Sequence, residues 1–283
     1  MNYRHAYHAG NHADVLKHAV LARVIQYLAQ KDKAFAVLDA HAGLGVYDLQ
    51  ATEAAKTGEW QGGVGFMQAP FAAAVEEILA PYRRALSRLN PDGGIRLYPG
   101  SPEIILGELR AGDRLLANEL HPQDFETLKL NYSGEKRLLA LLSDAGQVIK
   151  AQLPFRERRG LVLIDPPYEG RDETEQVARM LAQGAERFPT GMFMIWYPVT
   201  TEEFVTRFTG AIKALGIGNI LRAELRVKNS HAASGLSGSG LLILNPPFNL
   251  QSELEILLPA LAGRLGVENL GRSQLSWLTP PKG

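Results

Sequence analysis

The sequence contains no cysteine among its 283 residues, so disulfide bonds and thiolate metal sites are excluded. It also lacks net charge, because 30 lysines and arginines balance 30 aspartates and glutamates. A protein that coats nucleic acid without selectivity is strongly basic, so this balance restricts any nucleic-acid contact to one local surface. No apolar run reaches membrane-spanning length, and residues 1–14 lack the apolar core of a secretory signal. A cytoplasmic location, with no membrane partner, is therefore expected.

What is present is typical of a globular protein: hydrophobic residues make up 46% of the chain and charged residues 21%. The length suits a single domain over residues 1–283 that carries an insertion. Histidines are concentrated near the start, where His8 and His12 have the spacing of a metal pair on a helix. No acidic or sulfur partner completes such a site, so no metal is expected.

The most informative stretch is LVLIDPPYEG, residues 161–170. Residues 161–164 are apolar and read as a short buried strand. The two prolines after Asp165 cannot donate to a sheet ladder, so the strand must end there. A carboxylate, bare carbonyls and the ring of Tyr168 then lie at the carboxyl end of a strand. In open α/β sheets, ligands bind at that edge.

These groups suit an exocyclic amine of a nucleobase, which has two N–H groups and a delocalised lone pair. The Asp165 carboxylate and the Pro166 carbonyl can each accept one N–H and aim the lone pair at an electrophile. Tyr168 can stack on the ring, so these three residues are the catalytic candidates. A short motif of this kind also occurs as an ordinary strand-to-loop turn. It is duplicated as NPPF, with Asn245 and Phe248 in the corresponding positions.

The order of polar positions along the chain favours a cofactor site. The apolar strand 35–40 is followed by the glycine loop 41–45, which lacks the G-x-G-x-x-G spacing of a dinucleotide site. The second strand ends in Glu119, where a carboxylate suits a ribose diol, and the third region reaches Asp144, which could accept from an adenine amino group. With Asp165 on the fourth strand, this succession resembles class I methyltransferases that use S-adenosylmethionine (AdoMet).

The expected fold is therefore α/β: a class I, Rossmann-like, AdoMet-dependent methyltransferase with a seven-stranded mixed sheet and helices on both faces. Segments 192–198, 220–227 and 240–248 supply strands five to seven. Asn245 follows the seventh strand, away from the cofactor edge, so NPPF is interpreted as a structural turn. The segment QLSWLTPP near the end could add an edge strand.

Two further segments are expected to surround the site. A helix from about residue 12 to 30, with Asn11 as N-cap, could turn Lys17 and His18 towards a ligand. Residues 46–96 interrupt the strand-helix rhythm and are interpreted as an inserted, mainly helical subdomain. Its arginines could grip a phosphate backbone, or the insertion could simply cover the cofactor.

Several motifs together resemble one family, the bacterial 23S ribosomal RNA (adenine-N6)-methyltransferases called RlmJ. They are YRHAYHAGNHADVLKH, LDAHAGLGVY, YPGSP, ELHP, LIDPPYE, WYP and LNPP. The resemblance implies methyl transfer from AdoMet to N6 of one adenine, adenine 2030 of 23S rRNA, with Asp165 as catalytic carboxylate. The partner it implies is 23S rRNA, free or partly assembled, and a monomeric enzyme is expected.

The resemblance also implies a set of binding residues. Tyr3 would meet the substrate nucleotide, and Ser101 is expected to cap a helix beside the cofactor. Family members commonly have Asp-Gly where this chain has Asp144-Ala145. The cofactor-binding residues that it implies are Lys17, His18, His41, Ser101, Glu119, Asp144, Ala145 and Asp165.

Three other functions stay open at this point. A methyltransferase of the same fold could instead act on an amine in DNA or in protein, because the D-P-P-Y motif does not distinguish these substrates from RNA. A non-catalytic RNA-binding protein with a vestigial cofactor site is the second, and the lack of net basic charge argues against it. A nicotinamide-dependent oxidoreductase is the third, and the missing third glycine disfavours it.

Overall fold

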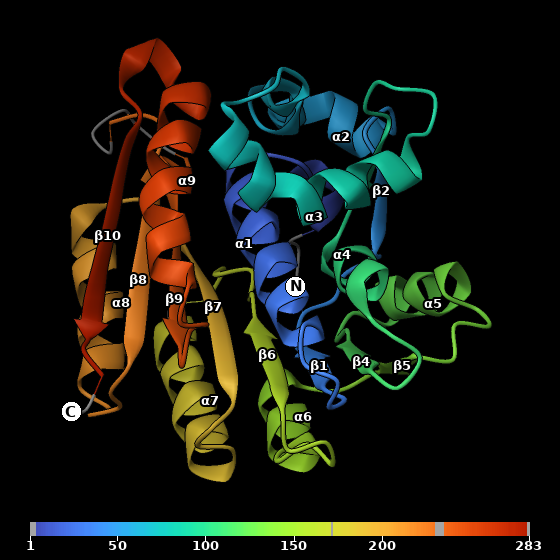
Figure 1. Cartoon of the computed structure of the whole chain (residues 1–283), viewed down its shortest axis with the longest axis vertical. Coiled ribbons are helices and arrows are strands. Elements are labelled where there is room, and N and C mark those ends of the chain that lie inside the picture. Colours follow the sequence, from blue (N-terminus) through green and yellow to red (C-terminus); the bar gives the residue numbers. More distant parts are fainter. Residues whose placement is uncertain (1–3, 171, 230–234, 282–283) are drawn as a thin grey trace.

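The computed structural model describes residues 4–170, 172–229 and 235–281, and Tyr3 lies outside these ranges. An eight-stranded sheet forms the middle layer, with the strand order β10-β8-β9-β7-β6-β1-β4-β5 (Figure 1). The strands are β1 (Ala36–Asp39), β4 (Arg114–Asn118), β5 (Leu138–Leu141), β6 (Gly160–Ile164), β7 (Met192–Val199), β8 (Ile220–Arg226), β9 (Gly238–Leu244) and β10 (Arg272–Thr279). All seven expected strands are present, and the eighth, β10, is the edge strand anticipated near the end of the chain.

The five strands β7, β6, β1, β4 and β5 are parallel, whereas β9 runs antiparallel to both of its neighbours. Strands β1, β4 and β6 in the middle of the parallel part are buried on both faces, which explains their continuous apolar segments. Leu161 and Leu163 of β6 face one hydrophobic cluster, while Val162 and Ile164 face the other. The expected α/β architecture with a mixed sheet is confirmed.

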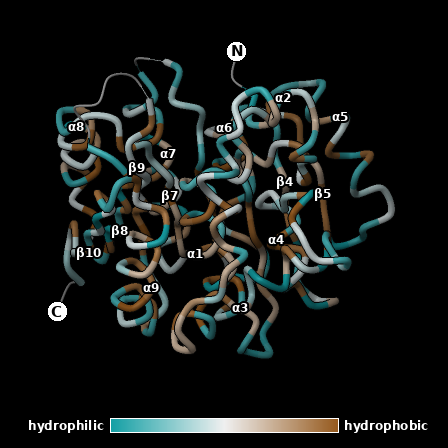
Figure 2. Tube along the Cα trace, turned by 90° about the horizontal axis from the view of Figure 1, so that it is seen from above, coloured by the Kyte–Doolittle hydropathy of each residue, from teal (hydrophilic) through white to brown (hydrophobic). Residues whose placement is uncertain are grey.

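Helices cover both faces of this sheet, as the view from above shows (Figure 2). One face packs against α1, α4 and α9, and the other against α6, α7 and α8. The helices are α1 (His12–Ala29), α2 (Thr52–Thr57), α3 (Ala73–Leu89), α4 (Ser101–Glu108), α5 (Pro122–Asn131), α6 (Ala145–Gln152), α7 (Glu173–Arg187), α8 (Glu202–Lys213) and α9 (Leu250–Leu265), with short 3₁₀ turns η1 (His5–Tyr7), η2 (Glu59–Gly62), η3 (Val64–Gln68) and η4 (Val267–Asn269). In the described part of the chain, no helix is both long and apolar enough to cross a membrane.

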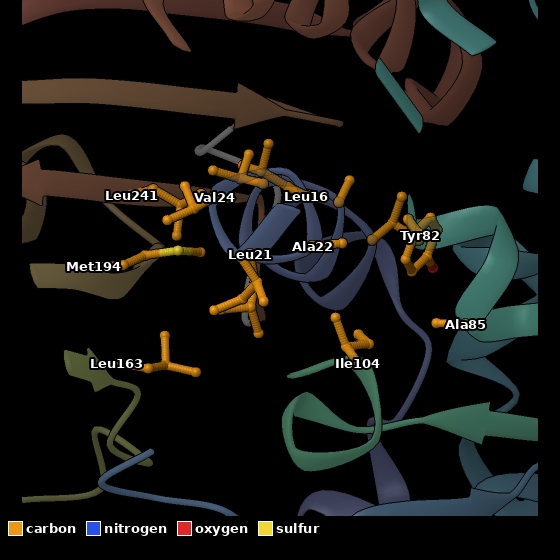
Figure 3. Close-up of a cluster of buried hydrophobic side chains, with 14 of the residues drawn as sticks. Leu16, Leu21, Ala22, Val24, Tyr82, Ala85, Ile104, Leu163, Met194 and Leu241 are labelled. Carbon is orange, nitrogen blue, oxygen red and sulfur yellow. The ribbon is translucent and has the colours of Figure 1, made fainter. Parts of the chain in front are cut away.

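Helix α1 is the buried centre of one layer, with apolar side chains around most of its circumference. Figure 3 shows Val24 beside Met194 of the sheet, and Ala22 on the opposite side beside Tyr82 of α3. The expected helix bounds are confirmed within one residue, and Asn11 caps the helix by accepting the N–H groups of residues 13 and 14. Because α1 is packed on two sides, its first two turns hold a fixed position at the edge of the sheet.

Residues 46–96 contain α2, η2, η3 and α3, and the short strands β2 (Val46–Asp48) and β3 (Leu97–Pro99) pair at its base. The arginines of this segment are already ion-paired, which favours the interpretation as a cover rather than a phosphate grip. The four pairs are Arg83–Glu76, Arg84–Glu108, Arg88–Glu103 and Arg96–Asp48.

Two local predictions can be compared with the backbone. The N-cap of α4 is Gly100 and Ser101 is its first residue, so the expected cap at Ser101 was wrong by one position. The NPPF turn lies where β9 ends, opposite the start of β7, because β9 runs antiparallel. There, the Asn245 side-chain amide donates to the carbonyls of Pro189 and Gly191 at 2.9 and 2.8 Å. The Asn245 side chain thus stabilises the NPPF turn, which agrees with its interpretation as a structural turn.

Candidate active site

A cavity of about 1000 Å³ opens at the carboxyl ends of β1, β4, β6 and β7. It gathers side chains that are far apart in sequence, as expected for parallel strands that share one edge. Every predicted site residue in the described ranges lines it, whereas Tyr3 lies outside those ranges. The residues are Lys17, His18, His41, Ser101, Glu119, Asp144, Ala145, Asp165, Pro166 and Tyr168.

Asp165 follows the last residue of β6, and its side chain is only 15% exposed. Its Oδ2 forms an ion pair with Nζ of Lys17 at 2.5 Å. Its backbone N–H donates to Nδ1 of His41 at 3.1 Å, which leaves the His41 proton on Nε2. Burial lowers the pKa of His41 to about 4, so the ring is neutral near pH 7. The turn is therefore fixed through both its side chain and its backbone.

Tyr168 is locked in an unusual backbone conformation, with φ of +55°. A non-glycine residue in this region costs roughly 1–2 kcal/mol, and such outliers cluster at functional sites. The Tyr168 hydroxyl donates to the Trp196 carbonyl at 2.7 Å. Its ring packs edge-on against Trp196 and also contacts Phe204 and Phe208. The ring is thus held rigidly in the cavity wall.

Lys17 is almost completely buried and lies between two carboxylates. Besides Asp165, its Nζ lies 2.9 Å from Oδ1 of Asp14. Burial lowers the pKa of Lys17, but the two carboxylates outweigh burial and raise the pKa above its ordinary value. The ammonium form is therefore retained, and it also lies 5.8 Å from the centre of the Trp196 ring.

His18, on the next position of α1, is uncharged. Its Nδ1 is 2.8 Å from the hydroxyl of Tyr98, which lies 3.3 Å from the hydroxyl of Tyr82. Burial lowers the pKa of His18 to about 3. This chain of neutral polar groups fixes the His18 ring without adding charge to the cavity.

The glycine loop lies against Glu119. The Gly43 N–H donates to one oxygen of this carboxylate at 2.9 Å, and the His121 N–H donates to the other at 2.8 Å. Burial raises the pKa of Glu119. Gly43 and Gly45 have φ of +60° and +84°, and an added Cβ at Gly45 would overlap the ring of Tyr132. Both positions therefore require glycine, and Gly43 lines the cavity with its backbone alone.

The far wall is formed where α6 begins. Asp144 is the N-cap of α6, and its Oδ1 accepts the Gln147 N–H at 3.0 Å. Ala145 is the first, buried residue of this helix. One carboxylate oxygen of Asp144 is thus engaged by the helix, which leaves the other for a ligand. Asp144 lies three residues beyond the end of β5, so the expected strand end was slightly misplaced.

Asp39 ends β1 directly below the glycine loop and is fully buried. Its Oδ1 accepts the His41 N–H at 3.3 Å. Burial raises the pKa of Asp39 to about 7, although the Ser101 hydroxyl lowers it. This carboxyl therefore changes charge near neutral pH.

His5 and His8 near the N-terminus each contact a carboxylate. His8 precedes α1, so it does not share a helix face with His12, and its Nδ1 lies 3.0 Å from Glu59. The Glu59 carboxylate raises the pKa of His8. Over residues 4–170, 172–229 and 235–281, no group of three or more His, Asp or Glu side chains could hold a metal ion.

Two residues of the site had no predicted role. Trp196 lies near the end of β7 and contacts both Lys17 and Tyr168. The WYP segment was part of the family resemblance, and an aromatic residue near a strand end could have identified it. Asp14 lies in the first turn of α1, where it is 1% exposed and pairs with Lys17. The i,i+3 spacing on a helix is compatible with that pair, whereas its burial depends on how α1 packs.

The sequence of this chain is similar to those of known proteins over most of its length. A family model described as "Ribosomal RNA large subunit methyltransferase D, RlmJ" matches residues 32–279. Two proteins called "Ribosomal RNA large subunit methyltransferase J" are similar over 99% of this chain and 99% of their own length. The Haemophilus influenzae protein is 41% identical over 281 residues, and the Escherichia coli protein is 39% identical over 282.

The fold is also shared with a crystal structure from Legionella pneumophila. That protein has a TM-score of 0.86 and 30% sequence identity, and the match covers 95% of this chain and 98% of that one. The family model and the two full-length relatives show the same membership that the motifs predicted. The chain belongs to the RlmJ family of ribosomal RNA large subunit methyltransferases and is an rRNA methyltransferase.

Proposed function

We propose that the protein transfers a methyl group from AdoMet to N6 of an adenine in 23S rRNA. The observation that carries this proposal is the turn at residues 165–168. It presents a carboxylate and the Pro166 carbonyl, with an aromatic ring beside them, to a large cavity at the carboxyl edge of the sheet. The family resemblance implies adenine 2030 as the target.

The residues present fit AdoMet. Gly43 lines the cavity without a side chain, so a ligand can approach its backbone closely. Glu119 and Asp144 place carboxylates at successive strand ends, where a ribose diol and an adenine amino group need acceptors. When bound, AdoMet supplies a methyl group that is already activated by a positively charged sulfur. Lys17, His18, His41, Ser101, Ala145 and Asp165 complete the proposed cofactor site.

Asp165 would act by position. Lys17 holds Oδ2, so we assign Oδ1 to one N6–H of the adenine, and the Pro166 carbonyl to the other. These two acceptors draw the nitrogen towards tetrahedral geometry and direct its lone pair. The extra proton leaves N6 after transfer, when the nitrogen is strongly acidic, so Asp165 need not be a strong base. Placement supplies most of the rate enhancement in such a scheme.

The adenine must leave its stack to reach this turn. Tyr168 would stack on the extruded base, and its bond to the Trp196 carbonyl would keep the ring in place. Tyr3, outside the described residues, is proposed to contact the substrate nucleotide. We further propose that the enzyme acts as a monomer on free or partly assembled 23S rRNA, in the cytoplasm, where that RNA is transcribed and assembled.

Mass mapping of N6-methyladenine in 23S rRNA tests the proposal, in cells with and without the gene. The proposal expects one adenine to lose its methyl group in the deletion strain and to regain it on complementation. Tritiated-methyl incorporation into deproteinised rRNA, DNA and protein then separates the target classes. Label in DNA or protein, with none in 23S rRNA, would contradict the proposed substrate.

A further inference from the structure

Asp14 is the centre of a group of buried contacts at the start of α1. Its Oδ2 accepts the backbone N–H of Gly10 and lies 2.9 Å from Nε2 of His5. Its Oδ1 lies 2.9 Å from Nζ of Lys17 and 4.0 Å from Nε2 of His18. The side chain is 1% exposed, yet it lines the same cavity as Asp165.

The three charges here form a continuous chain from Asp14 through Lys17 to Asp165. The side chains of Asp14 and Lys17 are 1% and 5% exposed, so solvent ions screen them weakly. The chain has two carboxylates for one ammonium, which gives a net charge of −1. Neutralising Asp14 would bring that net charge to zero.

Two described histidines, His18 and His41, contact this chain of charges from the cofactor side. His18 and His41 have pKa values lowered by burial to about 3 and 4, so both are neutral near pH 7. Trp196 contributes only the face of its ring. His5 contacts Asp14 from the N-terminal side.

We propose that Asp14 determines cofactor specificity: its charge makes the cavity prefer a positively charged methyl donor over the demethylated product. This inference rests on the proposed function, because it takes AdoMet as the donor. AdoMet and S-adenosylhomocysteine share the adenosine, the amino group and the carboxylate. They differ in the methyl group and in the positive charge on sulfur. The ratio of their affinities therefore isolates the interaction with that charge.

Asp14 does not need to touch the ligand to act in this way. A buried unit charge several ångströms from another retains a sizeable interaction at the effective dielectric of a protein site. Product inhibition would be reduced as a result, because the cavity that holds the donor loses affinity for its ligand when the sulfur loses its charge.

Isothermal titration calorimetry with AdoMet and S-adenosylhomocysteine tests this directly in the full-length chain. In Asp14→Asn, the preference for AdoMet over S-adenosylhomocysteine should fall about tenfold relative to wild type. Affinity for S-adenosylhomocysteine should stay within about threefold, because asparagine keeps the shape and one acceptor oxygen. Asp92→Asn removes the same charge from an exposed side chain that does not line the cavity, so it should leave the ratio unchanged.

A double variant separates charge from structure. Asp14→Asn with Lys17→Met restores the net charge of −1, so the affinity ratio should return towards the wild-type value. A purely structural role would make the double variant at least as defective as the single one. If Asp14→Asn fails to bind S-adenosylhomocysteine at all, the pair Asp14→Glu and Asp14→Gln makes the same comparison at equal size, and only the glutamine variant should lose discrimination.

The outcomes distinguish this inference from the function on which it rests. Wild-type protein that binds neither ligand would contradict the proposed cofactor. Wild-type protein that binds both, with an affinity ratio unaltered in Asp14→Asn, would overturn the role of Asp14 alone.

Discussion

The Nζ atom of Lys17 lies 2.5 Å from Oδ2 of Asp165, although 148 positions separate them in sequence. This contact joins the first helix to the turn after the fourth parallel strand of the chain. Lys17 occupies Oδ2 of the Asp165 carboxylate and thereby sets the direction from which Oδ1 can accept a hydrogen bond. The orientation of Asp165 therefore depends on a residue from another element.

Replacing the ammonium should affect both stability and activity. Lys17→Met leaves Asp14 and Asp165 without their cation, and breaking a buried ion pair typically costs about 3–5 kcal/mol. We expect that loss in urea unfolding, together with at least a hundredfold lower turnover. Lys129→Met is the control, because Lys129 forms an exposed pair with Glu126 and should change stability by less than about 1 kcal/mol. Equal stability losses in the two variants would contradict the role of burial.

The duplicated motif allows a matched test of Tyr168. Tyr168→Ala should lower kcat/KM for rRNA by about 5- to 150-fold, because base stacking on an aromatic ring contributes about 1–3 kcal/mol. Tyr168→Phe keeps the ring and loses only the bond to Trp196, so a much smaller effect is expected. Phe248→Ala, at the same place in the NPPF turn, is 87% exposed and should leave kcat/KM unchanged. A defect in Phe248→Ala equal to that of Tyr168→Ala would count against this assignment.

The glycine loop predicts a strong contrast between two substitutions. Gly45→Ala places a Cβ into Tyr132 at a φ of +84°, so calorimetry should show at least tenfold weaker AdoMet binding. Gly210→Ala lies in α8, where an added Cβ meets no atom within 4 Å. That variant should bind AdoMet normally and gain about 0.4–1 kcal/mol of stability. Normal AdoMet binding by Gly45→Ala would show that the loop does not face the cofactor.

Asp39 predicts a specific pH dependence of stability. Burial raises its pKa from an ordinary 3.8 to about 7, so the folded protein binds this proton more tightly than the unfolded chain. The contribution of Asp39 to the free energy of unfolding therefore falls as pH rises from about 4 to about 7. Asp39→Asn should match wild type near pH 4 and be more stable by about 2–4 kcal/mol at pH 8. Denaturant titrations at both values check this, and a constant difference would contradict it.

The sequence predicted those parts of the molecule that depend on local pattern. Strand ends at residues such as Glu119 and Asp165 follow from apolar runs bounded by acids and prolines. The bounds of α1 followed from its cap at Asn11 and the spacing of its apolar residues. The order of the strands along the chain also separated DPPY from NPPF, because an antiparallel strand delivers its end to the opposite edge.

Long-range pairing was not predictable in the same way. The pairing of Lys17 with Asp165 depends on how α1 packs against the sheet, and no periodicity encodes that. The arginines at residues 83–96 looked suited to phosphate, yet each one meets a carboxylate brought in by folding. Local charge runs do not reveal which cations remain available for RNA.

The most direct measurement for the whole account is single-turnover methyl transfer to 23S rRNA by Asp165→Ala. Titration of the same preparation with AdoMet reports whether its cofactor site is intact. The account predicts that transfer is abolished while AdoMet affinity stays within a few-fold of wild type. Turnover close to the wild-type rate would contradict it, because the amine would then not depend on this carboxylate for its position.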